Sequence, residues 1–499
     1  MSLKSLISQH FANYVIKKIY KKYQHPESEQ KKVFENIINT AKNTNFGIEH
    51  NFSKINNYDD FVNNVPIRDY EQLSQYIEQI KLGKKDVLWK GKPIYLAKTS
   101  GTTSGNKYIP ITKESISNHI NSARNAILAY IEETKKTDFI NGKMIFLQGS
   151  PILDEISGIK TGRLSGIVVH HVPLYLQKNR MPSYKTNCIE DWEEKVDKIA
   201  KETLDKNMTL ISGIPPWVQM YFDKLTLKTE KKISQIFPNF SLFIYGGVNY
   251  EPYRQKLESS IGKKIDSIEL YPASEGFFAY QNSQKDNGLL LIIDSGIFYE
   301  FIKAEDVFKP NAKRLPLWDV EIGVNYALVI NSNAGLWGYL IGDTIKFISN
   351  NPYKIRVTGR IKHFISAFGE HVIAEEVESA LKYALENIKA EISEFTVSPM
   401  VNPPNKELPY HEWLIEFEKE PKDMSSFQIL IDNKLRELNS YYDDLITGKI
   451  LQPIKIKSLP KDCFINYMKS KGKLGGQNKL PRLSNDRIIA EEISNFCLR

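Results

Sequence analysis

The chain has 499 residues, of which 41% are hydrophobic and 25% charged, so it can bury a large core and form more than one folding unit. Its 67 basic and 59 acidic side chains leave a net charge of +8, too mild a surplus to indicate nucleic acid as a partner. The sequence has no apolar run of about 18 residues that predicts a membrane span. Cys188, Cys463 and Cys497 are too few and too widely spaced for a disulfide framework, so we expect a protein of the reducing cytoplasm.

The N-terminal part is predicted to be helical. Met1 to Tyr23 lacks the apolar stretch of a signal peptide and is typical of a basic amphipathic helix. We expect this helix to dock on the protein with its charged face in solvent, rather than to bind an anionic membrane. Apolar residues recur at helical spacing from Glu27 to Thr44 and from Ser115 to Glu133, which predicts two more packed helices.

The central part of the chain alternates apolar runs with amphipathic segments. These patterns predict strands at 144–147, 208–211, 242–245 and 268–271, and helices at 191–207, 216–236 and 251–261. Strands and helices that alternate in this way form a largely parallel sheet covered by helices. The predicted fold class is therefore α/β.

The helical pattern stops between Leu289 and Phe347, where short alternating strands predict an antiparallel subdomain. Turn-forming residues follow at Ser349 to Pro352, and we expect the main domain boundary there. Beyond it, helices at 372–385 and 427–438 and strands at 413–417 and 454–456 predict a small α/β unit. The two expected domains are residues 1–350 and 351–499.

One stretch, Lys98 to Lys107, concentrates hydroxyls, two glycines and two lysines between apolar runs that predict flanking strands. Glycines let backbone N–H groups turn toward an anion, hydroxyls add donors, and lysine adds charge, so such a hairpin suits a polyphosphate. Its spacing differs from that of a Walker A loop. A flexible polar turn is the alternative interpretation.

Two strands of the predicted parallel sheet end in residues that suit a nucleotide, because ligands gather at the carboxyl ends of such strands. One strand ends in Gly246 and Gly247, which let a flat ring approach the backbone. The other ends in Tyr271, Ser274 and Glu275, which can stack on a ring, donate to a phosphate and hold Mg²⁺. Each of these residues taken alone is also typical of a turn.

Further candidates follow along the chain. Asp343 comes after a predicted strand and a glycine, where its carboxylate can accept ribose hydroxyls, although a turn aspartate is the simpler reading. A glycine-containing loop near the C-terminus presents Lys479. The sequence has no H-E-x-x-H, no G-x-S-x-G and no helix-opening G-x-G-x-x-G, so a zinc protease, a serine hydrolase and a Rossmann dinucleotide site are not expected.

The order of these motifs is the specific signal. The chain resembles the acyl-acid amido synthetases named after the plant auxin-responsive Gretchen Hagen three genes, a family of adenylate-forming enzymes. The likeness runs from about Tyr95 to Arg482, and Thr99 and Pro272-Ala273 depart from the family pattern. The motifs that carry it are Thr99-Ser100-Gly101-Thr102-Thr103-Ser104-Gly105, Tyr271-Pro272-Ala273-Ser274-Glu275, Tyr339-Leu340-Ile341-Gly342-Asp343, Gly359-Arg360-Ile361-Lys362 and Gln477-Asn478-Lys479-Leu480-Pro481-Arg482.

The resemblance implies a ligase that uses ATP and Mg²⁺. A carboxylic acid would attack the α-phosphorus of ATP to give an acyl adenylate and pyrophosphate, and an amino acid or other amine would then take the acyl group and release AMP. Residues 1–350 would bind ATP and the acyl acid, and residues 351–499 would form a mobile domain. The sequence does not identify the acid, the amine or the oligomeric state.

The resemblance also implies roles for individual residues. Lys479 and Glu275 are the expected catalytic residues, and Glu275 is the expected ligand of Mg²⁺. Arg124, on the helix after the hairpin, is the expected contact of the acid substrate, although a surface arginine is the plainer alternative. The expected nucleotide-binding residues are Ser100, Gly101, Thr102, Thr103, Gly246, Gly247, Tyr271, Ser274, Asp343 and Arg360.

Two other functions stay open. The first is an acyl-CoA ligase of the same superfamily, although Ser366 and Lys362 depart from the pattern of the thioester-forming relatives. The second is an adenylate-binding protein without activity, although Glu275, Asp343 and Lys479 are all present.

Overall fold

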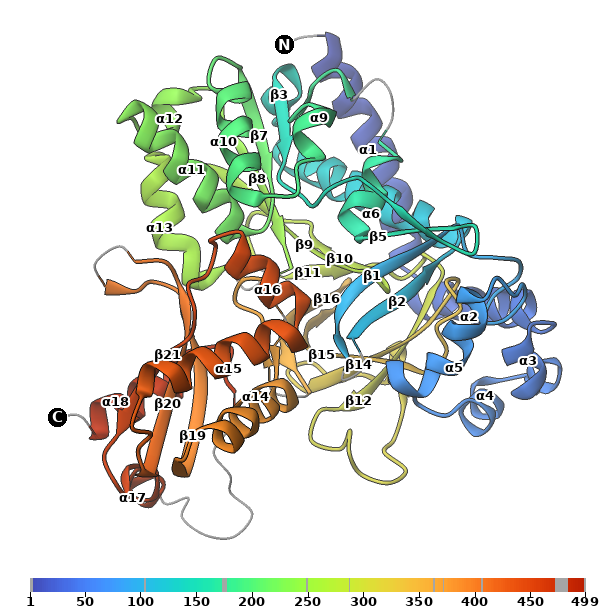
Figure 1. The fold of residues 1–499 in the computed structure, drawn as a ribbon. Helices are drawn as coiled ribbons and strands as arrows, with labels where there is room; N and C mark the ends of the chain where they lie inside the picture. Colours follow the sequence, from blue (N-terminus) through green and yellow to red (C-terminus); the bar gives the residue numbers. More distant parts are fainter. Residues whose placement is uncertain are drawn as a thin grey trace.

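The computed structural model describes residues 3–102, 105–172, 177–247, 250–286, 288–361, 364–370, 372–404, 407–471 and 483–497. These residues form a large unit and a smaller C-terminal unit that lies against one side of it (Figure 1). In the described part, the large unit contains a 12-stranded sheet in the order β13-β12-β14-β15-β16-β11-β10-β9-β8-β7-β3-β6. The fold is mixed α/β with a separate small C-terminal domain, which confirms the predicted class.

The parallel part of this sheet matches the prediction. Its neighbouring parallel strands are β6 (Arg180–Met181), β3 (Lys143–Phe146), β7 (Met208–Ser212), β8 (Leu242–Gly246) and β9 (Asp266–Ala273). The first four residues of both β7 and β8 are buried, because the sheet is covered on both faces.

The sheet separates two apolar cores, because successive side chains of a strand point to opposite faces. On β8, Leu242 and Ile244 belong to the core that also contains residues of α6 (Lys113–Thr134) and α1 (Leu3–Tyr23). Phe243 and Tyr245 belong to the second core, which includes residues of α10 (Trp192–Thr203), α11 (Pro215–Thr229) and α13 (Glu251–Ile261). This second core continues into the C-terminal unit, so one apolar cluster joins the two units.

Most predicted helices are present, but one of them is divided. Instead of a single helix over 216–236, the chain forms α11 and the short α12 (Ile233–Ile236). Glu230 adopts a left-handed conformation, with φ 56°, which ends α11. The helix predicted from Glu27 to Thr44 is α2 (Pro26–Ala41). The N-terminal region adds helices that were not predicted: α3 (Asn45–Glu49), α4 (Tyr58–Asn64) and α5 (Tyr70–Lys81).

The predicted antiparallel strands are part of the same sheet rather than a separate subdomain. The change of direction takes place at the tight hairpin between β9 and β10. The antiparallel strands are β10 (Gly276–Gln281), β11 (Leu289–Leu291), β12 (Ile297–Lys303), β13 (Leu315–Pro316), β14 (Asn325–Ser332), β15 (Tyr339–Asn350) and β16 (Tyr353–Arg360).

The boundary predicted at Ser349 to Pro352 falls inside this sheet. Asn350 and Tyr353 pair across a hairpin turn, so these residues connect β15 to β16 and do not link two domains. Turn-forming residues mark hairpins as well as linkers, and the sequence pattern alone does not separate the two. The chain leaves the sheet only after Arg360.

The candidate phosphate hairpin lies in a second sheet. In the described residues, this four-stranded sheet has the order β2-β1-β5-β4, with β1 (Tyr95–Thr102) and β2 (Gly105–Ile111) forming the hairpin. The other strands are β4 (Asp154–Ile156) and β5 (Ile159–Gly162), and α7 (Leu164–Val169) follows them.

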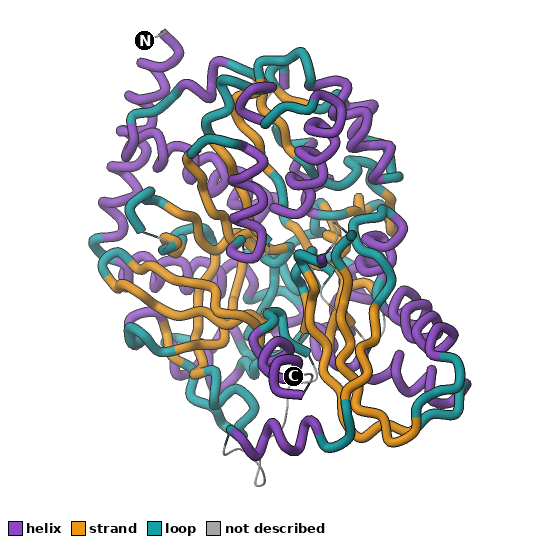
Figure 2. The backbone as a smooth tube through the Cα atoms, turned by 90° about the vertical axis from the view of Figure 1, so that its left-hand side faces the viewer, coloured by secondary structure: helices purple, strands orange, loops and turns teal. Residues whose placement is uncertain are grey.

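In the residues that the structure describes, the C-terminal unit has a three-stranded sheet covered by helices (Figure 2). Its strands are β19 (Glu391–Met400), β20 (Tyr410–Lys419) and β21 (Lys455–Leu459). A short pair, β17 (Phe364–Ile365) and β18 (Val372–Ile373), precedes them. The helices are α14 (Ala374–Asn387), α15 (Met424–Leu438), α16 (Ser440–Thr447), α17 (Cys463–Ser470) and α18 (Ile488–Cys497).

The structure corrects the expectation drawn from the cysteines. Cys463 and Cys497 form a disulfide with their Cα atoms 5.7 Å apart, whereas Cys188 is free. The two partners are 34 residues apart in sequence, and the packing of α17 against α18 brings them together. Spacing along the chain carries no signal for such a pair.

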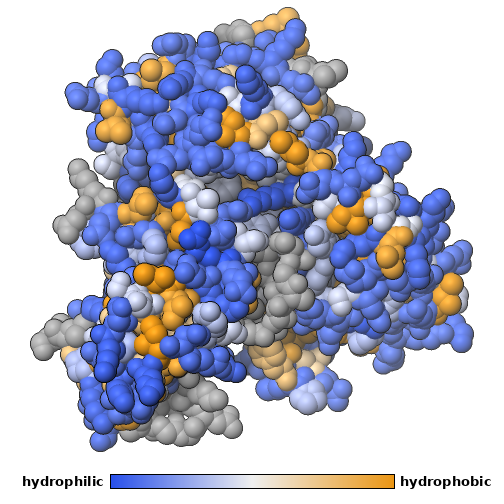
Figure 3. Space-filling model, viewed as in Figure 1, coloured by the Kyte–Doolittle hydropathy of each residue, from blue (hydrophilic) through white to orange (hydrophobic). Residues whose placement is uncertain are grey.

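The visible surface is mainly hydrophilic, with apolar residues in small groups (Figure 3). Among the described residues, no helix is both long enough and apolar enough to cross a membrane. The basic helix α1 docks through Ser5, Ala12, Ile16 and Tyr23, which are buried.

Candidate active site

The hairpin of β1 and β2 has the predicted order of strand, turn and strand, but the strands extend into the expected loop, because β1 reaches Thr102 and β2 begins at Gly105. Thr99 pairs with Lys107 and Thr102 with Gly105, while Thr103 and Ser104 lie outside the described residues. The backbone of Ser100, Gly101 and Thr102 continues β1 to its end. The Lys107 ammonium lies 5.5 Å from the centre of the Tyr70 ring, so a cation–π contact holds this lysine beside the hairpin.

The two glycines after β8 are required by the backbone. A Cβ atom on Gly246 would lie 2.4 Å from the carbonyl oxygen of Leu270, so no side chain fits there. Gly247 has φ +83°, a conformation that favours glycine. Gly246 is the parallel partner of Leu270, so this strand end lies beside the residue that precedes Tyr271.

Tyr271 and Asp343 are brought together although 72 residues separate them. The Tyr271 hydroxyl donates to Asp343 Oδ2 at 2.6 Å. The two residues are only 9% and 7% exposed, and the Tyr271 ring packs edge-on against Phe278 at 5.1 Å. The predicted ring-stacking and ribose-binding residues are therefore neighbours, and one oxygen of the carboxylate already has an internal donor.

Ser274 and Glu275 occupy the two-residue turn between β9 and β10, because Ala273 pairs with Gly276. Both residues are half-buried. The Tyr339 hydroxyl lies 3.4 Å from Glu275 Oε1, so the first residue of β15 contacts this turn. A turn at the edge of the strands presents the carboxylate where a ligand can reach it.

The backbones of Asp343 and Arg360 lie opposite each other on β15 and β16. They are register partners in the antiparallel pair, and the backbone of Ile361 donates to the carbonyl of Gly342 at 2.8 Å. Gly342 has a positive φ of 95°, which accompanies the irregular pairing of β15 with β14 between Leu340 and Thr344. Two predicted nucleotide-binding positions from different motifs are thus cross-strand partners in the sheet.

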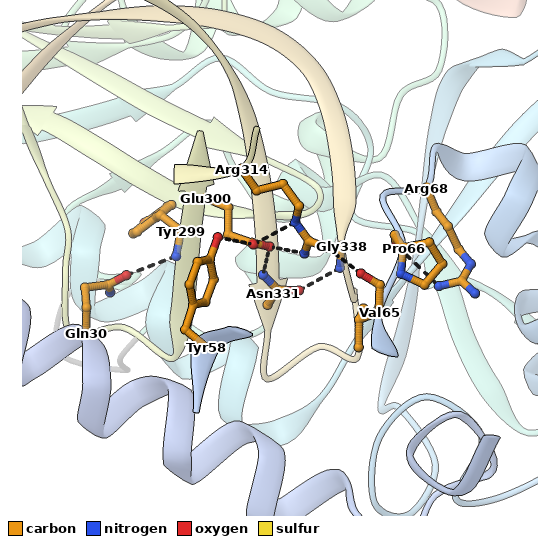
Figure 4. A network of polar contacts seen from close by, with 10 residues as sticks. All are labelled: Gln30, Tyr58, Val65, Pro66, Arg68, Tyr299, Glu300, Arg314, Asn331 and Gly338. Atoms are coloured by element: carbon orange, nitrogen blue, oxygen red, sulfur yellow. Dashed lines mark hydrogen bonds and ion pairs between the residues drawn. The ribbon is translucent and has the colours of Figure 1, made fainter. Parts of the chain in front are cut away.

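A buried polar network, for which the sequence pattern has no signal, holds the beginning of β15 (Figure 4). Glu300 Oε1 accepts from the Tyr58 hydroxyl at 2.8 Å and from Arg314 Nε at 2.9 Å. Glu300 Oε2 accepts from Arg314 Nη2 at 2.6 Å and from Asn331 Nδ2 at 2.7 Å. The Asn331 Oδ1 atom in turn accepts from the backbone of Gly338 at 2.6 Å.

This network connects the N-terminal helices to the candidate site. The Arg314 guanidinium also donates to the carbonyl of Val65, just after α4, and the backbone of Arg68 donates to the carbonyl of Gly338 at 2.8 Å. The side chains of Glu300 and Arg314 are 0% and 5% exposed. Because Tyr339 directly follows Gly338, the buried ion pair fixes the strand that carries Tyr339 and Asp343.

The C-terminal unit reaches the phosphate hairpin through α16. The Tyr441 hydroxyl donates to the carbonyl of Lys98 at 3.2 Å, and the Arg163 guanidinium lies 4.8 Å from the centre of the Tyr441 ring. Arg163 also forms an ion pair with Asp444. Burial raises the pKa of Tyr441, the charge of Arg163 opposes this shift, and the carboxylate of Glu275 adds to it. Tyr441 therefore lies within electrostatic reach of both the hairpin and the Glu275 turn.

One expected site residue is not brought into this group, and another lies outside the described residues. Arg124 is exposed on α6, and among the described residues its guanidinium donates only to Asn125 Oδ1, at 3.1 and 3.3 Å. Lys479 lies outside the described residues, so its role stays a prediction. Beyond it, Leu483 bridges to Val397 on β19, which fixes the segment that follows.

The whole fold is shared with two kinds of ligase. The structure of the acyl acid amido synthetase AtGH3.15 in complex with 2,4-DB matches with a TM-score of 0.61 at 17% identity, covering 98% of this chain and 96% of that one. A 2-hydroxyisobutyryl-CoA ligase in its thioesterification state matches with a TM-score of 0.57 at 12% identity, covering 95% and 92%.

Family models then identify the chain. The GH3 family N-terminal domain matches residues 15–187 and 154–265, the central domain 290–360 and the C-terminal domain 375–488. The chain belongs to the GH3 family. A jasmonoyl–L-amino acid synthetase, JAR4 of Nicotiana attenuata, is 22% identical over 67% of this chain and 70% of its own length. The indole-3-acetic acid-amido synthetase GH3.3 of Arabidopsis thaliana is 20% identical over 93% and 90%.

Proposed function

We propose that this protein is an ATP-dependent acyl-acid amido synthetase, which joins the carboxyl group of a small acid to the amine of an amino acid or another amine. One observation supports the proposal most directly: the Tyr271 hydroxyl donates to Asp343 Oδ2 at 2.6 Å, so two separate predicted motifs lie together, and Tyr339 of the second motif contacts Glu275 of the first. The related enzymes named above are amido synthetases, and the same reaction class fits a site built mainly of hydrogen-bond donors and carboxylates.

The first half-reaction forms the acyl adenylate. A carboxylate oxygen of the acid attacks the α-phosphorus of ATP, a new P–O bond forms, and the bond to pyrophosphate breaks. Backbone and hydroxyl donors of Ser100, Gly101, Thr102 and Thr103 would hold the phosphates, and Lys479 would stabilise the developing negative charge. The protein acts here by positioning the reactants and stabilising charge. The acid's own carboxylate is the nucleophile, so the protein does not need to supply one.

The nucleoside would lie between the strand ends. Gly246 and Gly247 would form one wall for the adenine ring and Tyr271 the other. Asp343 and Arg360 would hold the ribose, and Ser274 would donate to a phosphate. These roles rest on the resemblance to the family, and two cross-strand pairs support them: Asp343 with Arg360, and Gly246 with the residue before Tyr271.

The predicted site can accept a magnesium ion that is already bound to ATP. Among the described residues, no group of three or more His, Cys, Asp or Glu side chains could hold a metal ion by itself. Mg²⁺ bound to a nucleotide needs only one or two protein carboxylates, and Glu275 on its half-buried turn can supply one. The ion would neutralise phosphate charge during adenylation.

The second half-reaction forms the amide. The amine nitrogen attacks the acyl carbon, the C–N bond forms, the C–O bond to AMP breaks, and the nitrogen releases a proton to water. We propose that the unit from about residue 361 onward moves between the two steps, because a cation over the phosphates and an open path for an amine are different requirements.

The decisive experiment measures pyrophosphate release over a panel of carboxylic acids, followed by AMP release with amines or with coenzyme A. AMP release that depends on an amine, with an amide as product, supports the proposal. Thioester formation with the same acid would instead establish an acyl-CoA ligase. If no acid causes pyrophosphate release, the result would favour the third alternative, an adenylate-binding protein without activity.

A further inference from the structure

The loop from Ser366 to Glu370 in the C-terminal unit lies against the candidate site. A methyl group built on Gly369 would lie 3.9 Å from Ile214 Cδ1, which belongs to the residue just before α11. A methyl group built on Gly247 would lie 4.0 Å from the same Ile214 atom. One side chain of the large unit therefore separates this loop from the glycines at the end of β8.

A single buried carboxylate holds the end of this loop. Glu370 Oε2 accepts from the backbone of Phe368 at 2.7 Å, and Glu370 Oε1 lies 2.8 Å from His411 Nε2 on β20. Both side chains are 0% exposed. The other end of the loop is fixed from the same unit, since the backbone of Ser366 donates to Asn485 Oδ1 at 2.8 Å. The path of the loop thus depends on how Glu370 is oriented.

The same pair is connected to the helix that touches the phosphate hairpin. The His411 ring packs against the Tyr442 ring with centres 5.1 Å apart, and the Tyr442 hydroxyl donates to Asp432 at 2.6 Å. The preceding residue, Tyr441, contacts the carbonyl of Lys98. Glu370 and His411 therefore lie between the two places where the C-terminal unit approaches the candidate site.

We propose that Glu370, oriented by His411, is a positioning residue for the amide-forming half-reaction. This inference rests on the proposed function. The loop and Tyr441 both approach the site in the present arrangement of the units, and Glu370 touches neither the hairpin nor the predicted nucleotide positions. Its removal should displace the loop at the site and slow the attack of the amine, while adenylation proceeds. A displacement of about 1 Å in a reacting arrangement can cost roughly 10²-fold in rate.

The chain offers a matched control. Glu416 lies on the same strand as His411, is 2% exposed, and accepts from the backbone of Asp462 and Phe464 at 2.9 and 3.0 Å. Glu416→Ala removes a buried carboxylate with two acceptor bonds from the same unit, but at the start of α17 instead of at the loop. Glu370→Gln keeps the size and an acceptor oxygen for Phe368, so it serves as the conservative variant.

The rates of the two half-reactions are measured in the wild type and in each variant, with the acid and amine that the wild-type protein accepts. We expect Glu370→Ala to keep ATP–pyrophosphate exchange within about 3-fold of wild type and to lose about 10²-fold in amide formation from supplied acyl adenylate. Glu370→Gln should recover most of this loss, and Glu416→Ala should leave the ratio of the two rates unchanged. Wild-type amide formation by Glu370→Ala, or an equal loss in both assays, would overturn the proposal.

Amide hydrogen exchange on the whole chain without substrate supplies a readout that is independent of activity. Glu370→Ala should lose protection in peptides that cover residues 364–370, and Glu416→Ala only in peptides around residues 460–467. If Glu370→Ala does not fold, His411→Phe answers the same question, because it removes the bond to Glu370 Oε1 alone. Unchanged protection at 364–370 would refute the positioning role, even if the wild-type protein adenylates no acid and the proposed function fails.

Discussion

The buried ion pair of Glu300 and Arg314 should control both the stability of the large unit and the position of β15. Arg314→Met keeps most of the side-chain volume but removes the two guanidinium donors of Glu300. The carboxylate is 0% exposed and retains only Tyr58 and Asn331 as donors in this network. Breaking a buried pair on one side typically costs about 3–5 kcal/mol, so we expect a loss of that size in the free energy of unfolding.

A double variant separates the charge effect from lost packing. In Arg314→Met with Glu300→Gln, no charge remains buried, and the new amide can accept from Asn331 and donate to the Tyr58 oxygen. Replacing both partners of a buried pair is often nearly neutral, so we expect the double variant to recover at least about half of the loss.

Denaturant unfolding of the four proteins in this cycle is the measurement, with pyrophosphate exchange as a second readout of β15. The single Arg314→Met variant should lose exchange activity, because the network holds Gly338 next to Tyr339. If Arg314→Met costs less than about 1 kcal/mol, or if Glu300→Gln adds its own loss to it, the pair is not the constraint we infer.

Three further predictions concern the nucleotide, the catalytic lysine and pH. Asp343→Ala should weaken ATP binding by about 1.5–3 kcal/mol for each ribose bond lost and should no longer distinguish ATP from its deoxyribose analogue. If the variant keeps the wild-type preference for ATP, Asp343 has a structural role and does not bind the ribose. Lys479→Ala should lose about 10²–10³-fold in ATP–pyrophosphate exchange while still converting supplied acyl adenylate and amine, and equal losses in both assays would point to folding. Burial lowers the pKa of His119 to about 4, so the unfolded chain binds the proton first and stability should fall as pH drops from about 6.5 toward 4, by up to about 1.4 kcal/mol per pH unit. Unfolding of His119→Leu should lack that part of the pH dependence, and identical profiles for the two proteins would contradict the assignment.

The sequence predicted the elements that bury apolar residues with a clear period. The parallel strands β3, β7, β8 and β9 and the helix α13 lie where the pattern places them, because the covered sheet demands continuous apolar runs. The fold class and the hairpin of Thr99 to Lys107 followed from the same signals.

Contacts between distant segments leave no signal in the local sequence. Nothing in the local sequence pairs Tyr271 with Asp343, places Tyr441 beside Lys98 or joins Glu300 to Arg314, since each contact depends on the tertiary arrangement. The domain boundary expected at Ser349 to Pro352 is instead a hairpin turn between β15 and β16. A proline-containing turn has a similar local sequence in a hairpin and in a linker, so the pattern does not distinguish the two.

The apolar cluster that spans the two units has a thermodynamic consequence. Residues of β8 and α11 belong to the same core as Phe368 and Trp413 of the C-terminal unit. If the unit swings away during turnover, some of this surface meets water, and exposing apolar surface raises the heat capacity. The balance between the docked and the swung arrangements should therefore depend on temperature in a curved manner. The ratio of the two half-reaction rates should show the same curvature.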